Sequence, residues 1–568
     1  MGPVAIVAVV DADRPPSPAQ LGRFVRAVAA QTSDQWELHL GVVGTLPDAL
    51  SATLVSELAT GAAARLEVSS SPAGTPRALA ARSALRASSS EAVVPLDVRD
   101  RLAPDALAVL ATALSHDEAD VAYADEDRVS STGAFWGPLL KPDWSPELLS
   151  CWRYTGHPVM YRCNALQACG GIGTAAEGDW EHDLLLRLSE HTDRVAHVAE
   201  VLCHREDESF PLADAATASD GDAAPVSGAL ARRGELAEVD PGPIRGSWRI
   251  RRRPRDEPTV SVIIPFRDNP WFLRACVDSL VTTATGVRLD VILVDNGSSE
   301  PETAALLDRL EGRPRMTILR DPRPFNWAAL NNAAAAHARG DVLLFLNDDV
   351  EARAPGWVAA LSSHALRPHV GAAGARLLYP NGSVQHVGVA LGVAGPAVHL
   401  LAGLPGDEPG YLGMAQLTRD VSAVTGACLA TRGEVFERLG GFDEALGVEC
   451  SDIDYCLKAR ASGLRIVCEA NVDLVHHESP SRGTSYNSVE VLRFCDRWAD
   501  VIDAGDPYLN RNLSRAGRAA ALRGPHEGDP MHQWRIDRTL LRARTDPTLL
   551  HLLAAVPAVA RARASRSA

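Results

Sequence analysis

The chain has 568 residues, which is too long for one ordinary hydrophobic core, so about two to four domains are expected. With 46% hydrophobic and 23% charged residues, the composition excludes a largely disordered chain. A formal net charge of −16 excludes a broad basic surface for nucleic acid. The 10 cysteines include no C-x-x-C pair, which argues against a zinc ribbon and favours buried thiols in a reducing cytoplasm.

The N-terminal residues MGPVAIVAVVDADRPP have no basic region before their short apolar run, so they predict a first β-strand rather than a signal peptide. No stretch approaches the roughly 18 apolar residues that a membrane span requires. We therefore expect a cytoplasmic protein with at most a peripheral contact to the inner face of the plasma membrane.

Both halves of the chain begin with strand-like apolar runs. In the first half these runs are residues 4–10 and 36–45, and the polar residues 213–228 predict an exposed or disordered loop. A basic, proline-containing segment at 241–258 then predicts a linker. The second half alternates strands and helices, in the order strand 260–266, helix 271–281, strand 291–299, helix 327–340 and strand 341–349, with Gly340 as the expected helix C-cap.

This alternation predicts an α/β fold with a parallel sheet covered on both faces. In such sheets ligands bind beyond the carboxyl ends of the strands. Asp295, Asp348 and Asp349 stand at such ends.

The two halves share motif spacing, which predicts an internal duplication. Residues 155–162 correspond to 425–432, and 181–188 correspond to 452–459. The segment 202–206 aligns with 474–478, which places His204 opposite His476, and Val42 takes the place of Asp295.

Asp348 and Asp349 offer oxygen ligands of the kind that Mg²⁺ and Mn²⁺ prefer. Taken alone, Asn-Asp-Asp after a strand favours a simple turn. A second strand-like run ends at His476 and His477, and a neutral imidazole can complete a metal shell beside a carboxylate.

Asp452 is predicted near the start of a helix. One interpretation is structural: Ser451 would be the N-cap, and the acidic first turn would favour the helix dipole. The other interpretation is chemical, with Asp452 as a general base that deprotonates an attacking sugar hydroxyl.

Together these motifs resemble glycosyltransferase family 2, inverting enzymes of GT-A fold that use nucleotide-sugar donors. The resemblance extends over residues 258–485 and is carried by VSVIIPFRD, VILVDNGSS, PFNWAALNNAAA, LLFLNDDVEA, VSAVTGACL, ERLGGFDE, SDIDYCLKARASGLRI and VHHESPSRG. More narrowly, the chain is similar to tandem family 2 proteins of bacterial surface-polysaccharide assembly, of the O-antigen and rhamnose-polymer type.

The resemblance implies a fold of two tandem GT-A (Rossmann-like) domains followed by a helical tail. The expected boundaries are 1–235 for a degenerate first domain, 236–257 for the linker, 258–515 for the catalytic domain and 516–568 for the tail. It also implies a nucleotide-diphosphate sugar as donor, a glycan or lipid-linked glycan as acceptor, and Mg²⁺ or Mn²⁺ as cofactor.

Roles for single residues follow from the same resemblance. Asp452 would be the catalytic base, and Asp349 and His476 would be the metal ligands. The nucleotide-sugar would contact Pro265, Asp268, Asp295, Asn331 and Asp348, and the acceptor would lie at Thr425, Gly426 and Ala427. One departure is Ser451, because family members often have Glu or Asn before the aspartate that corresponds to Asp452.

The first half retains less of this pattern. Asp97 and Asp100 are separated by Val98 and Arg99, and a guanidinium opposes cation binding. Val42 cannot hydrogen-bond a base or ribose, although Glu181 occupies the base position. We expect this half to be inactive and to support the catalytic half or hold acceptor glycan.

Residues 534–568 carry seven arginines and two aspartates. They predict either a basic helix on an anionic membrane or an ordinary terminal helix. For the whole chain, the alternative to an enzyme is a non-catalytic glycan-binding or scaffolding protein of a polysaccharide assembly complex. A nucleotidyltransferase is disfavoured because VSVIIPFRDNP contains no glycine-rich phosphate loop.

Overall fold

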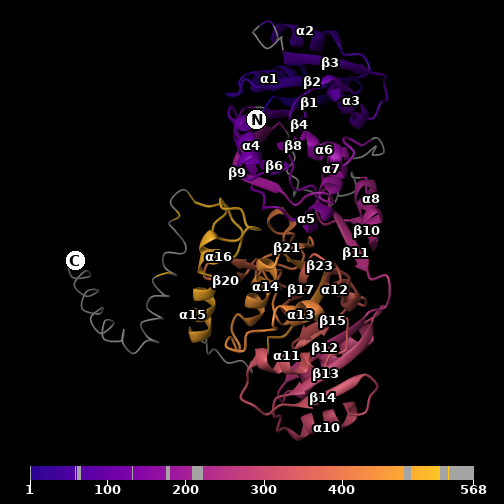
Figure 1. Cartoon of the computed structure of the whole chain (residues 1–568), viewed down its shortest axis with the longest axis vertical. Coiled ribbons are helices and arrows are strands. Elements are labelled where there is room, and N and C mark those ends of the chain that lie inside the picture. The colour runs from indigo at the N-terminus through magenta and orange to yellow at the C-terminus, as the bar shows by residue number, and fades with distance from the viewer. Residues whose placement is uncertain are drawn as a thin grey trace, which may run out of the picture. The chain divides into compact units, whose positions relative to one another are not determined.

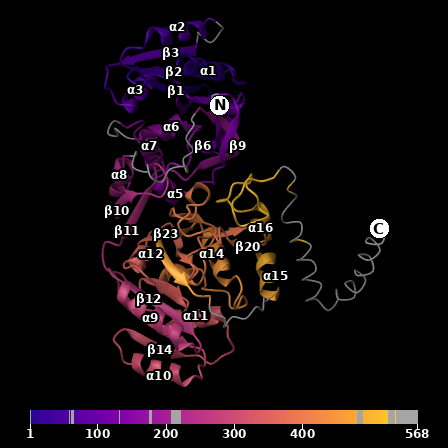
Figure 2. The same ribbon diagram turned by 180° about the vertical axis from the view of Figure 1, so that it is seen from behind.

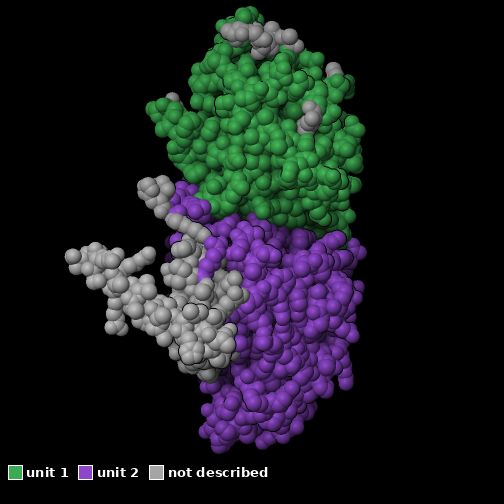
Figure 3. Space-filling model, turned by 60° about the vertical axis from the view of Figure 1, so that its left-hand side comes forward, with its two compact units in different colours: residues 1–250, 510–512 green, residues 251–509, 513–568 purple. Residues whose placement is uncertain are grey.

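The structure is a computed structural model that describes residues 2–57, 59, 65–130, 132–173, 179–206, 222–478, 488–524, 527 and 535. Its contacts divide the chain into two compact units, coloured separately in Figure 3. Unit 1 comprises residues 1–250 and 510–512, and unit 2 comprises residues 251–509 and 513–568.

Unit 2 is built on a ten-stranded mixed sheet (Figure 1). The order along the sheet is β14-β13-β12-β15-β22-β17-β23-β16, with β18 paired to β17 and β21 paired to β23. Strands β12, β13, β14 and β15 are parallel, whereas β22 runs antiparallel to its neighbours. The strands are β12 (Thr259–Phe266), β13 (Arg288–Asp295), β14 (Met316–Arg320), β15 (Val342–Leu346), β16 (Val350–Ala352), β17 (Val370–Leu378), β18 (Val384–His386), β21 (Arg419–Val421), β22 (Cys428–Arg432) and β23 (Arg465–His476), beside a hairpin of β19 (Val389–Leu391) and β20 (Ala397–His399).

Helices cover both faces of this sheet. On one face, leucines of α9, α10 and α12 pack against alternate residues of β12, β13 and β15. On the other face, Phe345 meets Phe436 of α13 and Phe442, so α9 and α13 lie on opposite sides (Figures 1 and 2). The helices are α9 (Pro270–Thr283), α10 (Pro301–Leu310), α11 (Trp327–Ala335), α12 (Trp357–Ala365), α13 (Gly433–Arg438), α14 (Ser451–Ala461), α15 (Ser488–Arg497) and α16 (Ala499–Ala504). Burial on both faces explains the continuous apolar strands.

Two predicted helix ends in unit 2 are wrong. Helix α11 ends at Ala335, so Gly340 is not its C-cap. Gly340 instead lies against β12, where its N–H donates to Ser261 Oγ and an added Cβ would stand 2.5 Å from Ser261 N. Helix α14 begins at Ser451, and Cys450 in a left-handed conformation takes the N-cap position without a side-chain hydrogen bond.

Unit 1 has a nine-stranded sheet of order β3-β2-β1-β4-β8-β6-β9-β5, with β7 paired to β6. Each strand has a counterpart at the same place in the unit 2 sheet, and parallel and antiparallel pairs correspond. The strands are β1 (Val4–Asp11), β2 (Trp36–Val43), β3 (Leu66–Ser71), β4 (Ala92–Leu96), β5 (Asp100–Leu102), β6 (Val121–Val129), β7 (Phe135–Leu139), β8 (Val159–Arg162) and β9 (Val195–Arg205). The helices are α1 (Pro18–Ala29), α2 (Asp48–Glu57), α3 (Arg77–Ala84), α4 (Ala106–His116), α5 (Pro146–Cys151), α6 (Cys163–Ala168), α7 (Trp180–Leu188) and α8 (Ala224–Arg233).

The chain is therefore a mixed α/β protein, as predicted. The two tandem GT-A domains and the degenerate state of the first stay predictions. The segment that we predicted as a linker contains a two-stranded sheet of β10 (Leu236–Pro241) and β11 (Trp248–Arg253). Helix α8 begins inside the predicted loop 213–228, and residues 207–221 lie outside the described residues. All 10 cysteines are described, none forms a disulfide, and most are buried as predicted.

Among the described residues, no helix is both long and apolar enough to cross a membrane. Most of the predicted helical tail at 516–568 lies outside the described residues, so its structure and its membrane contact stay predictions.

Candidate functional site

Two acidic groups of unit 2 lie at the carboxyl edge of its sheet. Asp295 is the last residue of β13 and pairs in register with Phe266, the last residue of β12. Strand β15 ends at Leu346, directly before Asn347, Asp348 and Asp349. Parallel strands bring these ends together, which is the place where sheets of this kind bind ligands.

A cavity of about 370 Å³ adjoins Asp295. Its lining comes from the end of β13, from α10 and from the segment after β14: Asp295, Gly297, Ser298, Ala304, Leu307, Asp308, Arg320 and Pro322. Asp295 Oδ1 accepts the backbone N–H of Ser298 at 2.8 Å, which fixes the loop at the cavity mouth.

Asp349 and His476 are brought together from distant parts of the chain. Strand β16 pairs antiparallel with the end of β23, so that Val350 lies opposite His476. His476 Nε2 is 3.1 Å from Asp349 Oδ1, and the Asp349 side chain is only 6% exposed. Within the described residues, no group of three or more His, Cys, Asp and Glu side chains could hold a metal ion. Among the described residues, a cation here would therefore have at most two His, Cys, Asp or Glu ligands.

Asp452 lies in the first turn of α14 and faces the turn before β22. Gly426 N–H donates to Asp452 Oδ2 at 2.7 Å, and Asp452 Oδ1 accepts Ile453 N–H at 2.8 Å. The same turn contacts the segment that carries Asp349, because Asn347 N–H donates to Ala427 O at 3.1 Å. The carboxylate is thus held in one orientation, and a single turn joins it to the segment that carries Asp349.

The remaining predicted site residues differ in their surroundings. Pro265 lies near the end of β12, opposite Val294. The Asp268 carboxylate accepts the N–H groups of Ser299 and Glu300 at 2.7 and 2.8 Å. Burial raises the pKa of Asp268, but these hydrogen bonds together outweigh burial, and the pKa lies below its usual value. Asp268 therefore shapes the loop after β13 through its side chain.

Asn331 is fully buried in α11, where its amide donates to Trp327 O at 2.8 Å. Its Oδ1 accepts no hydrogen bond from any described residue. Thr425 accepts the N–H of Cys428 through its carbonyl at 3.2 Å, which closes the turn that carries Gly426 and Ala427.

Sequence reasoning missed Gln385 of β18. Its Oε1 lies 2.6 Å from His476 Nδ1, and the residue is 5% exposed. An isolated glutamine between two apolar residues carries no motif, so only the pairing of β18 with β17 reveals it.

Unit 1 replaces both candidate metal ligands with arginines. Asp100 pairs with Arg205 as Val350 pairs with His476. Glu206 N–H donates to Arg99 O at 2.9 Å, as His477 N–H donates to Asp349 O at 3.0 Å. Arg99 thus stands at the position of Asp349, and Arg205 stands at the position of His476.

The predicted alignment of His204 with His476 is therefore wrong by one residue. The similar strings LCHRE and LVHHE suggested it, but the strand register places His204 opposite Asp127, as Val475 lies opposite Leu378. His204 Nδ1 is 2.6 Å from Asp127 Oδ1, so the His204 side chain has a hydrogen-bond partner within unit 1.

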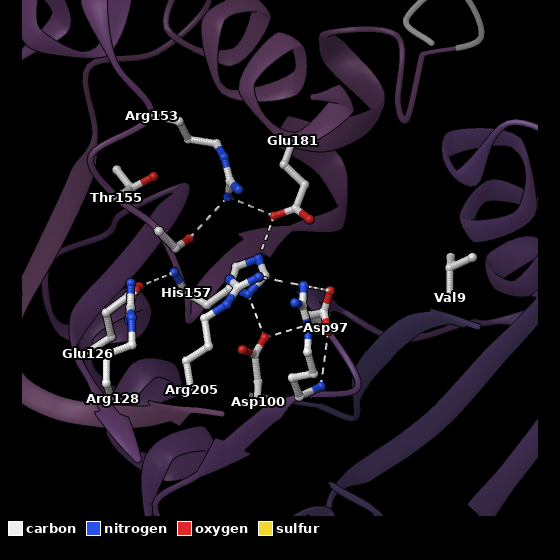
Figure 4. A network of polar contacts seen from close by, with 12 residues as sticks. Val9, Asp97, Asp100, Glu126, Arg128, Arg153, Thr155, His157, Glu181 and Arg205 are labelled. Atoms are coloured by element: carbon white, nitrogen blue, oxygen red, sulfur yellow. Dashed lines mark hydrogen bonds and ion pairs between the residues drawn. The ribbon is translucent and has the colours of Figure 1, made fainter. Parts of the chain in front are cut away.

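The rest of the unit 1 site is filled by a buried network of charges (Figure 4). His157 lies between two carboxylates, with Nδ1 2.5 Å from Asp100 Oδ2 and Nε2 2.7 Å from Glu181 Oε2. Arg153 donates to the same oxygen of Glu181 at 3.0 Å. Burial raises the pKa of Glu181, but His157 and Arg153 outweigh it and lower the pKa to about 2. A carboxylate held in this way is a poor proton acceptor.

Residues 261–440 match the family described as glycosyl transferase family 2. Unit 2 carries a glycosyltransferase family 2 domain. The match includes Asp295, Asp348, Asp349 and the turn at Gly426, and it ends before Asp452 and His476.

Curated relatives extend the similarity to both units. The chain is 38% identical over 546 residues to the O-antigen biosynthesis protein RfbC of Myxococcus xanthus, covering 93% of this chain and 42% of that protein. It is 35% identical over 532 residues to the uncharacterized protein y4gI of Sinorhizobium fredii, covering 90% and 58%. The chain thus spans about half the length of these two relatives.

A shorter match involves an N-acetylglucosaminyl-diphospho-decaprenol L-rhamnosyltransferase of Mycobacterium tuberculosis. It is 26% identical over 222 residues, which is 36% of this chain and 71% of that protein.

Proposed function

We propose that residues 258–515 form a GT-A catalytic domain that transfers a sugar, with inversion, from a nucleotide-diphosphate sugar to a glycan or lipid-linked glycan. The reaction would serve surface-polysaccharide biosynthesis. The family 2 domain and the O-antigen name of the Myxococcus relative support this proposal. The observation that carries it is the joining of Asp349, His476 and Asp452 through adjacent turns at one sheet edge.

The cavity beside Asp295 is the proposed site of the donor nucleoside. Its volume of about 370 Å³ falls in the range of roughly 300–1,000 Å³ that small-molecule sites have. Asp295 would bind the base or ribose, Pro265 and Asp268 would shape the adjoining backbone, and Asp348 would lie near the ribose and diphosphate. Asn331 would act from beneath the site, since it is buried.

Asp349 and His476 fit a hard divalent cation, Mg²⁺ or Mn²⁺. Such cations often bind one or two protein side chains and complete their shell with substrate phosphates and water. When bound, the cation supplies charge stabilisation for the departing nucleoside diphosphate. The protein contributes a carboxylate and an imidazole whose facing atoms are 3.1 Å apart.

Asp452 is the proposed general base. The Gly426 N–H fixes one of its oxygens, so the carboxylate is oriented before the acceptor binds. It would accept the proton of the acceptor hydroxyl as that oxygen attacks the anomeric carbon from the side opposite the leaving group. A single displacement of this kind inverts the carbon. The Thr425–Ala427 turn would border the acceptor.

We propose that unit 1 is a degenerate GT-A domain without transfer activity. Arginines at both metal-ligand positions and a Glu181 held by two cations support this role. Reading the whole chain as a glycan-binding scaffold is disfavoured, because unit 2 keeps Asp295, Asp349, Asp452 and His476 together.

The test is a panel assay with the purified full chain. We expect release of nucleoside diphosphate from one nucleotide sugar when Mn²⁺ or Mg²⁺ and a lipid-linked glycan acceptor are present. Asp349→Ala should lower this rate by at least about 100-fold, because it removes a metal ligand. Asp473→Ala, which changes an aspartate that pairs with Arg376, is the control. Metal-independent release by Asp349→Ala at the wild-type rate would refute the metal site.

A further inference from the structure

Gln385 is held in a fixed position beside the candidate metal ligands. It lies in the middle of β18, which pairs with β17, and it is 5% exposed. Its Oε1 stands 2.6 Å from His476 Nδ1, and its carbonyl oxygen stands 3.2 Å from His399 Nδ1. Both ends of the residue are thus engaged.

The contact determines which nitrogen of His476 carries hydrogen. An amide oxygen can only accept a hydrogen bond, so Nδ1 must be the donor. In the neutral ring, Nε2 then keeps its lone pair. Nε2 lies 3.1 Å from Asp349 Oδ1 and 3.5 Å from Asn347 Nδ2. Nε2 and Asp349 Oδ1 are therefore placed to hold one divalent cation between them.

We propose that Gln385 is a positioning residue that presents His476 Nε2 to a divalent cation bound with Asp349. This inference rests on the metal site of the proposed function. Histidines that bind metals commonly donate their other N–H to an oxygen acceptor, which fixes the tautomer and the ring orientation.

Unit 1 supports the coupling between the two residues. There β7 takes the place of β18. Leu139 of β7 lies opposite Glu126, in the same way as His386 of β18 lies opposite Leu377, so Leu139 corresponds to His386. The residue before Leu139 is Pro138, which has no side-chain acceptor, whereas the residue before His386 is Gln385. The unit that lacks the histidine also lacks the amide.

The test measures Mn²⁺ binding to the full chain by the loss of the free-ion EPR signal, without any nucleotide or acceptor. Gln385→Leu should weaken Mn²⁺ binding by about 10–100-fold, the range found for such supporting contacts. Gln385→Glu keeps an oxygen acceptor, so its affinity should stay within about threefold of wild type or increase. Gln416→Leu is the matched control, because Gln416 bonds the Gly406 carbonyl and touches no candidate ligand.

The outcomes separate this inference from the proposed function. If wild type binds Mn²⁺ and Asp349→Ala abolishes binding, but Gln385→Leu binds normally, only the role of Gln385 is refuted. Equal losses in Gln385→Leu and Gln385→Glu would show a purely structural role and also refute it. If wild type binds no Mn²⁺ either alone or with a nucleoside diphosphate, the metal site fails, and this inference fails with it.

Discussion

At the scale of single residues, the two units differ in charge at matching positions. Asp349 and His476 of unit 2 can share a cation, whereas Arg99 and Arg205 bring positive charge to the same places of unit 1. His157 then fills the space between Asp100 and Glu181. A few substitutions thus place an internal ion network where unit 2 has its proposed ligand-binding edge.

The charge on His157 predicts a pH dependence of unit 1. Burial lowers the pKa of His157, but Glu181 and Asp100 outweigh it and raise the pKa to about 10. Between the ordinary value near 6.5 and about 10, the folded state binds a proton that the unfolded state has lost, so stability falls as pH rises. Hydrogen exchange of peptides from α7 and β8, corrected for intrinsic rates, should show less protection at pH 9 than at pH 7.

In His157→Gln this loss of protection between pH 7 and 9 should disappear. The variant should also be less stable at pH 7 by about 3–5 kcal/mol, because one partner of a buried ion pair is removed. His116→Gln is the control, since His116 is 84% exposed beside Asp117. Equal pH dependence in wild type and His157→Gln would contradict the protonated state of His157.

At the scale of elements, the turn between residues 425 and 427 joins the proposed base to the segment that carries Asp349. Its central residue, Gly426, has no room for a side chain. A Cβ on Gly426 would stand 2.6 Å from Trp327 Cη2 and 3.3 Å from Asp452 Cβ. The turn can therefore approach α14 closely enough for the Gly426 N–H to reach Asp452.

Gly426→Ala should displace this turn from Asp452. We expect transfer to fall about 10–100-fold, because small displacements at a reacting centre are costly. Stability should fall by about 1–3 kcal/mol from overpacking. Nucleoside diphosphate binding should stay near wild type, since the cavity at Asp295 is lined by other elements.

The measurements are nucleoside diphosphate release, thermal melting and nucleotide titration. Gly433→Ala is the matched control, because the nearest atom to its added Cβ is 3.6 Å away. Unchanged transfer by Gly426→Ala would show that the turn does not position the base.

At the scale of the whole molecule, much of the organisation follows from sequence. Apolar runs ended by polar residues predicted the strands β12, β13 and β15. Because Asp295 and Asp349 follow two of these runs, their position at the carboxyl edge of the sheet was predicted as well. Shared motif spacing predicted a repeated layout, and the strand orders of the two sheets correspond. These features depend on local periodicity and on the geometry of parallel strands.

Other features depend on contacts that no local pattern encodes. Gln385 reaches His476 across 91 residues, and only the folding of β18 and β23 places them together. The alignment of His204 with His476 was wrong because it followed the similar sequences LCHRE and LVHHE. The register of β9 is instead set by its pairing with β5 and β6. The end of α11 was misplaced because Gly340 is not a helix cap. It is a glycine because the backbone of β12 passes too close to leave room for a side chain.

The central claim is that unit 2 catalyses transfer and unit 1 does not. The most direct test compares two isosteric variants of the full chain, Asp452→Asn in unit 2 and Glu181→Gln in unit 1, by metal-dependent nucleoside diphosphate release with acceptor. We predict that Asp452→Asn loses at least about 100-fold in rate, the usual range for a general base, while still binding nucleotide. Glu181→Gln should transfer at the wild-type rate. Full activity in Asp452→Asn, or lost activity in a Glu181→Gln protein that stays folded at the assay temperature, would contradict the account.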